Sequence, residues 1–62
     1  MVCFDRNGET GNIFFILGAA DAELLELGKR EEALEMNDRV MKSMGYEEAL
    51  KIIGEYVDLK EV

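Results

Sequence analysis

The stretch that decides the fold runs from residue 24 to residue 46 and reads LLELGKREEALEMNDRVMKSMGY. It contains Gly28 and Gly45, and each glycine separates two segments whose apolar residues recur with the period of a helix. Glycine is common where helices end, because it adopts the left-handed conformation without steric cost. The spacing therefore predicts three short helices, at about residues 12–27, 31–43 and 46–57. Together they would form one domain of residues 1–62.

The first predicted helix is apolar on more than one side. Its main stripe consists of Ile13, Leu17, Ala20, Leu24 and Leu27. Phe14, Gly18 and Leu25 lie beside this stripe, so we expect either neighbouring helices or a second subunit to cover the helix on that side. Gly18 costs a helix interior up to about 1 kcal/mol relative to alanine, which favours a close backbone contact there. Phe14, Gly18 and Leu25 are therefore the candidate self-association face.

The two ends of the chain carry weaker signals. Residues 1–11 are predicted to form an irregular tail that folds back on the helices, with a turn at Asn7-Gly8 and with Phe4 covering one end of the core. Residues 57–62 alternate apolar and polar side chains like a strand, and they either fray or lie against residues 2–4. The predicted fold class is all-α, a compact three-helix bundle with a short irregular N-terminal tail.

Charge limits the partners that the chain can bind. Fourteen acidic and seven basic residues give a net charge of −7, which disfavours direct contact with nucleic acid or with an anionic membrane. The acidic surface either keeps the protein dispersed or attracts a basic partner. The residues that would form such a surface are Glu31, Glu35, Asp38, Glu47 and Glu48.

The residue types needed for catalysis and metal binding are scarce. The chain has no histidine and one cysteine, so we expect no catalytic residue, no cofactor and no metal site. Cys3 is expected to be a buried or half-buried thiol, and a single thiol suits the reducing cytoplasm. The chain also shows no targeting signal and no apolar run of membrane-spanning length, so we expect a cytoplasmic protein.

Charged and aromatic residues on the second and third helices have structural interpretations. Acid-before-base spacing of four residues predicts the ion pairs Glu35–Arg39, Asp38–Lys42 and Glu47–Lys51. Tyr46 and Tyr56 fall on the apolar stripe of the third helix. Each is expected to pack its ring in the core and to direct its hydroxyl towards water, although an interface role is the alternative.

Two short motifs carry a resemblance. Gly11-Asn12 precedes an apolar run with an internal glycine, and residues 46–50 read Tyr-Glu-Glu-Ala-Leu. From Gly11 onward the chain resembles small uncharacterised proteins of bacteria, their phages and mobile elements. The resemblance implies a genomic setting and no particular activity. The chain departs from it at Asp21 and Glu23, where such proteins are expected to be basic.

Two functions are compatible with these patterns. A chain of 62 residues buries only about 60% of its unfolded surface, and this one has neither a disulfide nor a metal to stabilise it. The first hypothesis is therefore a non-enzymatic helical module that binds an unidentified protein and forms a homo-oligomer. The alternative is an inhibitor of the phage or mobile-element type that mimics nucleic acid and occupies a basic groove of a nucleic-acid-binding effector.

Overall fold

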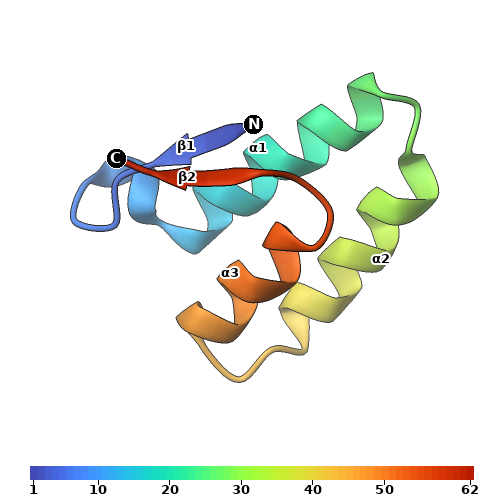
Figure 1. The fold of residues 1–62 in the computed structure, drawn as a ribbon. Helices are drawn as coiled ribbons and strands as arrows, with labels where there is room; N and C mark the ends of the chain where they lie inside the picture. The colour runs from blue at the N-terminus through green and yellow to red at the C-terminus, as the bar shows by residue number, and fades with distance from the viewer.

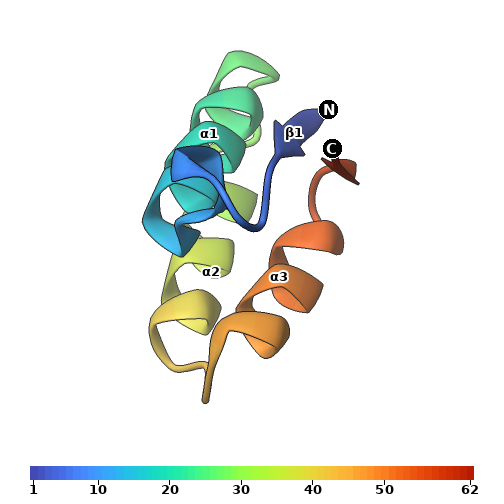
Figure 2. The same ribbon diagram turned by 90° about the vertical axis from the view of Figure 1, so that its left-hand side faces the viewer.

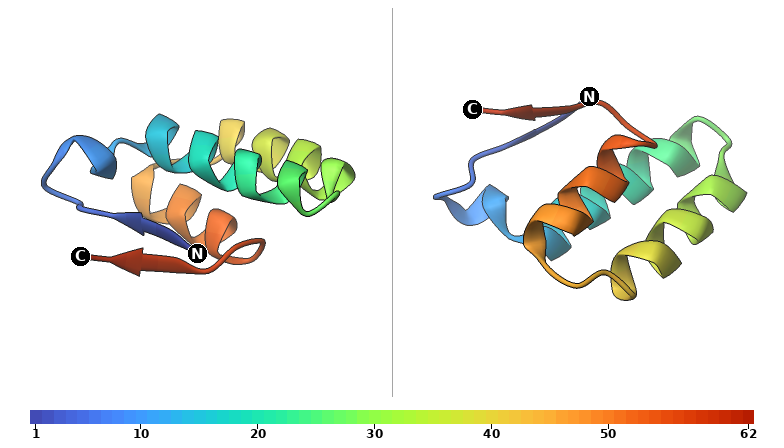
Figure 3. Two further views of the ribbon diagram at one scale, coloured as in Figure 1. Left: turned by 90° about the horizontal axis from the view of Figure 1, so that it is seen from above. Right: turned by 60° about the horizontal axis from the view of Figure 1, so that its bottom comes forward.

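The structure, a computed structural model, describes residues 1–62 and contains three helices and two short strands (Figure 1). In chain order the elements are β1 (Val2–Phe4), the 3₁₀ turn η1 (Glu9–Gly11), α1 (Ile13–Glu26), α2 (Arg30–Met41), α3 (Tyr46–Gly54) and β2 (Leu59–Glu61). They form two layers, with α1 beside α2 in one layer and α3 with the two strands in the other (Figures 2 and 3). The three predicted helices are thus confirmed.

The ends of α1 follow from local sequence. The side-chain oxygen of Asn12 accepts a hydrogen bond from the amide of Phe14 at 2.8 Å, which caps the first turn. At the other end Gly28 adopts a φ of 76°. The amide of Gly28 donates to the carbonyl of Leu25 at 3.1 Å, and that of Lys29 donates to Leu24 at 2.8 Å. These two bonds form a Schellman motif, which confirms Gly28 as the left-handed residue that ends the helix.

Gly45 separates α2 from α3, but not in the way that the sequence suggested. We expected it to close the second helix, whereas α2 ends at Met41 and Gly45 is the extended N-cap of α3, with a φ of 174°. The third helix ends at Gly54 rather than at Val57. Beyond it the chain tightens into a 3₁₀-like turn, in which the amide of Tyr56 donates to the carbonyl of Ile53 at 3.0 Å.

The prediction of an all-α fold is wrong in one respect, because the two ends of the chain form a parallel two-stranded sheet. Val2 pairs with Leu59, and Phe4 pairs with Glu61. The amide of Val2 donates to Asp58 at 2.7 Å, and that of Val62 donates to Phe4 at 2.8 Å. The alternative in which the last residues lie against residues 2–4 is therefore confirmed, and the irregular tail is wrong for β1. The two strands come from opposite ends of the chain, and each supplies the hydrogen-bond partners that the backbone of the other needs.

A tight connection joins β1 to α1. The amide of Gly8 donates to the carbonyl of Asp5 at 2.9 Å, and the amide of Asn7 donates to the side chain of Asp5 at 3.0 Å. Gly11 is buried beside this turn, where a Cβ atom would overlap the backbone carbonyls of Asp5 and Arg6. Only glycine fits this close approach. The Gly11-Asn12 motif therefore combines a steric requirement with a helix cap.

The core lies between the two layers and is entirely apolar. Fourteen buried side chains form it, and no polar or charged residue is buried. The largest fully buried side chains are Ile16, Leu24, Met36 and Ile53, so every helix contributes at least one of them. Phe4 closes the core from the side of the sheet with 4% of its surface exposed, as the sequence predicted.

We expect the substitution Gly28→Ala to lower the free energy of unfolding by about 1–2 kcal/mol, because alanine is strained in the left-handed region. No atom lies within 4 Å of the position of the added methyl group, so backbone strain acts alone. Urea denaturation followed by circular dichroism measures the effect.

Gly54→Ala is the matched control. Gly54 is the last residue of α3, and a Cβ atom there would make an ordinary 3.8 Å contact with Leu59. This variant should be at least as stable as the parent, because alanine is the better helix former. A Gly28→Ala protein with unchanged stability would contradict the assigned left-handed cap.

Candidate interaction surface

The side of α1 that points away from α3 and the sheet is exposed and apolar. Phe14, Gly18, Ala22 and Leu25 follow one another at steps of four, four and three residues, so they lie along one side of the helix. All four are exposed, and Phe15 is exposed beside them. The structure thus places the three residues of the candidate self-association face, Phe14, Gly18 and Leu25, together on one accessible stripe.

Gly18 has no close neighbour within the chain. No atom lies within 4 Å of the position of a Cβ atom at this residue. Our expectation of a close backbone contact at Gly18 is therefore wrong for the single chain. Of the two alternatives for covering this side of α1, neighbouring helices or a second subunit, the chain does not provide the first. The buried residues of α1 are Ile16, Leu17, Ala20 and Leu24, which form one face only.

The neighbouring helix α2 extends the apolar surface. Leu34 and Met41 are exposed on α2, three residues before and four residues after Asn37. Asn37 donates a hydrogen bond of 2.8 Å to Asp21 of α1 and another of 2.8 Å to the carbonyl of Ala33. The two helices therefore meet along this side, with the Asp21–Asn37 bond at its centre. We call the surface formed by Phe14, Phe15, Gly18, Ala22, Leu25, Leu34 and Met41 the α1–α2 face.

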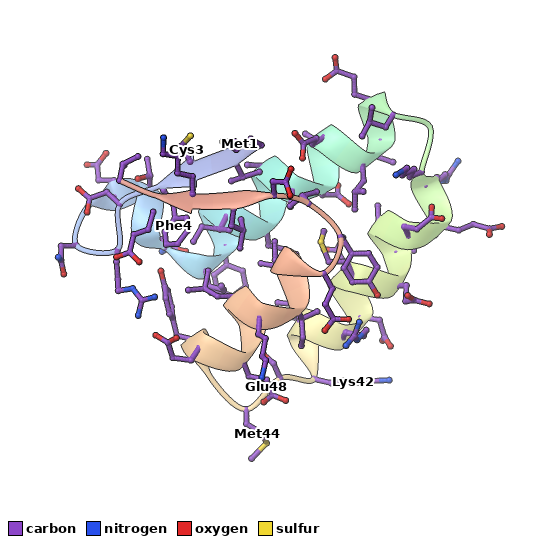
Figure 4. All side chains as sticks on the ribbon, in the orientation of Figure 1. Met1, Cys3, Phe4, Lys42, Met44 and Glu48 are labelled. Atoms are coloured by element: carbon purple, nitrogen blue, oxygen red, sulfur yellow. The ribbon has the colours of Figure 1, made fainter.

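A shallow hollow marks one end of the α1–α2 face. It has a volume of about 340 Å³ and is lined by Ile13, Phe14, Val40, Met41, Ser43, Met44, Gly45, Tyr46 and Ala49. Phe14 and Met41 share its wall, which shows that the apolar side chains of the two helices adjoin. Met44 projects from the loop between α2 and α3 at this end, with 91% of its surface exposed (Figure 4).

The α1–α2 face is a sizeable part of the surface of this small chain. Phe14, Phe15, Leu25, Leu34 and Met41 are each between 49% and 68% exposed. They expose roughly 500 Å² in total, taking about 150–200 Å² for a fully exposed large side chain. The total accessible surface of the chain is 4258 Å². Patches of this size on monomers are often functional, and larger ones mark interfaces.

The five acidic candidates do not form one free surface. Glu35 accepts a hydrogen bond from the hydroxyl of Tyr56 at 2.5 Å, and Glu48 accepts one from the amide of Met44 at 2.8 Å. Asp38 pairs with Lys42 at 3.1 Å, and Glu47 pairs with Arg6. Glu31 is exposed in the first turn of α2. Most of the acidic candidates therefore have partners within the chain.

Two of the three predicted ion pairs are replaced by contacts between elements. Only Asp38–Lys42 forms as predicted. Arg39 binds Glu55 beyond the end of α3 through its two terminal guanidinium nitrogens, at 2.9 and 3.1 Å, instead of pairing with Glu35. An arginine bound to a carboxylate by two hydrogen bonds is held more strongly than one in a single contact along a helix, so Arg39 pairs with Glu55.

Tyr56 lies at the centre of a polar cluster between α2 and the end of α3. Its hydroxyl donates to Glu35 and accepts from Arg39 at 3.1 Å, and the guanidinium of Arg39 lies 5.7 Å from its ring centroid. The hydrogen bond to Glu35 raises the pKa of Tyr56, because the carboxylate favours the protonated phenol. The hydrogen bonds from Arg39 lower the pKa of Glu55.

Tyr46 has an equivalent arrangement at the start of α3. Its hydroxyl donates to the carbonyl of Gly11 at 2.6 Å, and the guanidinium of Arg6 lies 5.5 Å from its ring centroid. Arg6 also pairs with Glu47 and, at 3.4 Å, with Glu61 of β2. Both tyrosine rings pack against the core, as predicted, but their hydroxyls bond to protein groups rather than to water alone. Sequence periodicity cannot show these partners, which are distant in the chain.

Cys3 is the one thiol of the chain. Cys3 is exposed on the sheet and points away from the helices, so the expectation of a buried or half-buried thiol is wrong (Figure 4). The alternation of β1 buries Val2 and Phe4 and turns the residue between them outward. No group of three acidic, thiol or imidazole side chains is placed to hold a metal ion. None of the helices has the length and apolar character that crossing a membrane requires.

Comparison with known proteins adds no further constraint. No protein-family model, no curated protein and no solved structure matches the chain. The resemblance at Gly11-Asn12 and at residues 46–50 therefore stays a prediction, and the function has to be argued from the surface itself.

We expect Tyr56 to ionise at a higher pH than a free tyrosine side chain, whose pKa is about 10. The variant Tyr46→Phe leaves Tyr56 as the one tyrosine, so absorbance at alkaline pH reports this group alone. Adding Glu35→Gln to that variant should lower the pKa of Tyr56, because the charged acceptor is removed.

The same shift has a consequence for stability. Because the pKa of Tyr56 is higher in the folded than in the unfolded protein, its hydrogen bond to Glu35 adds to the free energy of unfolding. This contribution is fully present below the unfolded pKa near 10 and is lost as the pH rises through the folded value. Identical titration curves with Glu35 and with Gln at this position would contradict the assigned hydrogen bond.

Proposed function

We propose that this protein is a non-enzymatic interaction module that self-associates through the α1–α2 face. The observation that carries the proposal is the face itself, an exposed apolar surface on a chain with a net charge of −7. Apolar side chains drive association when they leave water, at about 25 cal/mol per Å². A second copy of the chain supplies a matching apolar face without needing any complementary charge.

The area of the face suits a dimer. Each partner of a stable complex buries about 800 Å², and the five large side chains of the α1–α2 face supply roughly 500 Å² of that. The remainder would come from Gly18, Ala22 and the polar rim. The only charge at the centre of the face is Asp21, whose carboxylate is already hydrogen-bonded to Asn37. Burial of the face would leave the Asp21 carboxylate charged at its centre, with only the hydrogen bond from the neutral Asn37 amide to stabilise it.

The need of a small chain for extra burial also supports self-association. The core contains 14 side chains, and no disulfide bond supports it. Association of two copies would remove further apolar surface from water and so stabilise both. With its one thiol exposed and no disulfide partner in the chain, we further propose that the module acts in the reducing cytoplasm.

The alternative, an inhibitor that mimics nucleic acid, has less support. Such a mimic needs a row of free carboxylates, whereas Glu35, Asp38, Glu47 and Glu48 each have a partner within the chain. Glu47 lies at the start of α3, and Glu35 binds Tyr56 beyond its other end. The acids are thus divided between the two ends of α3.

The test compares two leucines two residues apart on the same helix. Leu25 is 49% exposed on the α1–α2 face, whereas Leu27 is 62% exposed and lines a different hollow with Met1 and Glu23. We expect Leu25→Lys to weaken the dimer by about 10- to 100-fold, because each copy loses the burial of the exposed half of a leucine, which is about half of the 1.5–3 kcal/mol for a whole side chain. Leu27→Lys should have no such effect.

Light scattering coupled to size exclusion gives the readout. The parent and Leu27→Lys should show twice the 7.0 kDa mass of one chain, and Leu25→Lys should show a single chain at the same concentration. Both variants change the net charge equally, so only the position differs. A parent protein that is monomeric at high micromolar concentration would overturn the proposal, and so would equal dissociation of both variants.

A further inference from the structure

We propose that the two copies pair with their α1 helices antiparallel, across a two-fold axis that passes between Gly18 and Ala22. This inference rests on the proposed self-association and adds the geometry of the interface. Two features of α1 carry it, namely the distribution of charge along the helix and the position of its small exposed residues.

Charge on α1 is confined to one half of the helix. Residues 13–20 carry no charged side chain, whereas residues 21–26 include Asp21, Glu23 and Glu26, and no basic residue occurs anywhere in α1. In a parallel pair the acidic halves would lie against each other and repel. In an antiparallel pair Glu26 lies against the uncharged half of the other copy, whereas Asp21 lies one residue from the axis and stays close to Asp21 of that copy.

The helix dipole favours the same direction. Asp21 and Glu26 border the exposed stripe of α1, and Glu26 is exposed and forms none of the five salt bridges of the chain. The N-terminal turn of a helix carries partial positive charge on its free amides. The antiparallel pair brings Glu26 of one copy to the start of α1 in the other, where a carboxylate is stabilised.

The small residues fix where the helices cross. Gly18 and Ala22 lie one turn apart on the exposed side, and Gly18 has no atom within 4 Å of its Cβ position. Larger side chains flank them, Phe15 on one side and Leu25 on the other. Two helices approach most closely where both present small residues. With the axis between them, Gly18 of one copy faces Ala22 of the other, and Phe15 faces Leu25.

This register gives a prediction that a parallel pair cannot satisfy. Phe15 and Leu25 each lie five residues from the axis, so the same position in the two copies is separated by about 15 Å along the helix. Phe15 of one copy and Leu25 of the other lie opposite. A disulfide requires a Cα–Cα distance of about 4.4–6.8 Å. Only unlike positions can therefore be joined.

The experiment uses the full chain with Cys3→Ser, to which either Phe15→Cys or Leu25→Cys is added. Each variant alone and their equal mixture are first shown to be dimeric by light scattering at the working concentration, and are then treated with diamide as the oxidant. We expect the mixture to yield at least about ten times more covalent dimer than either variant alone. Mass spectrometry should show one chain of each kind in that product. Leu27→Cys, which is exposed but off the face, is the control and should not cross-link.

The outcomes separate this inference from the proposed function. Cross-linking of Leu25→Cys with itself would show a parallel pair and overturn the inference while leaving self-association intact. A dimer that cross-links in none of the preparations would overturn it too, because the interface would then lie elsewhere. If the Cys3→Ser chain without added cysteines is monomeric, the self-association fails and the inference fails with it.

Discussion

One constraint governs the rest of this structure, namely that a chain of 62 residues can cover α1 on one side only. The three helices and two strands form two layers, and in such an arrangement each helix buries a single face. For α3 this is enough, since its exposed residues are mostly charged, and α2 leaves Leu34 and Met41 as its exposed large apolar side chains. For α1 it is not, because residues 13–20 contain no polar side chain. The exposed α1–α2 face is the direct result of that mismatch.

The position of α3 depends on contacts at both of its ends. At the start Tyr46 reaches the carbonyl of Gly11, and beyond the other end Tyr56 reaches Glu35, while an arginine lies over each ring. These clusters are exposed, so each ion pair contributes little stability, but together they fix the direction in which α3 lies. Gly11 and Tyr46, which belong to the two motifs of the predicted resemblance, are thus in contact. The two motifs meet at one structural junction.

Local features of the sequence were predictable, and features that join distant residues were not. The cap at Asn12, the left-handed Gly28 and the three apolar stripes depend on neighbours within a few residues, so the sequence identified them. The pairing of Val2 with Leu59 was only one of two alternatives that the sequence allowed, because neither segment shows where the helices place the two ends of the chain. The predicted ion pair Glu35–Arg39 was wrong for the same reason. Glu55 comes close to Arg39 only in the folded chain, where it binds the guanidinium in place of Glu35.

The interaction surface was predictable in part. Phe14, Gly18 and Leu25 stood out as apolar residues beyond the needs of one core stripe, and the structure leaves all three exposed. The sequence did not show that Leu34 and Met41 are exposed. Both fall among the apolar residues of the second helix, and periodicity does not show which of those residues the rest of the chain covers. The distribution of the acids was equally hidden, since their partners lie on other elements.

The acidic character of the chain affects how two copies can associate in the proposed dimer. Two copies with a net charge of −7 repel each other in most orientations. The α1–α2 face brings few of these charges together, because Asp21 is the only charge at its centre. A two-fold arrangement buries the same apolar surface on both copies and leaves none for a third. In the proposed dimer the charge that surrounds the face would therefore limit association to a closed pair, whereas an equally apolar face on a neutral chain would also favour open-ended aggregation.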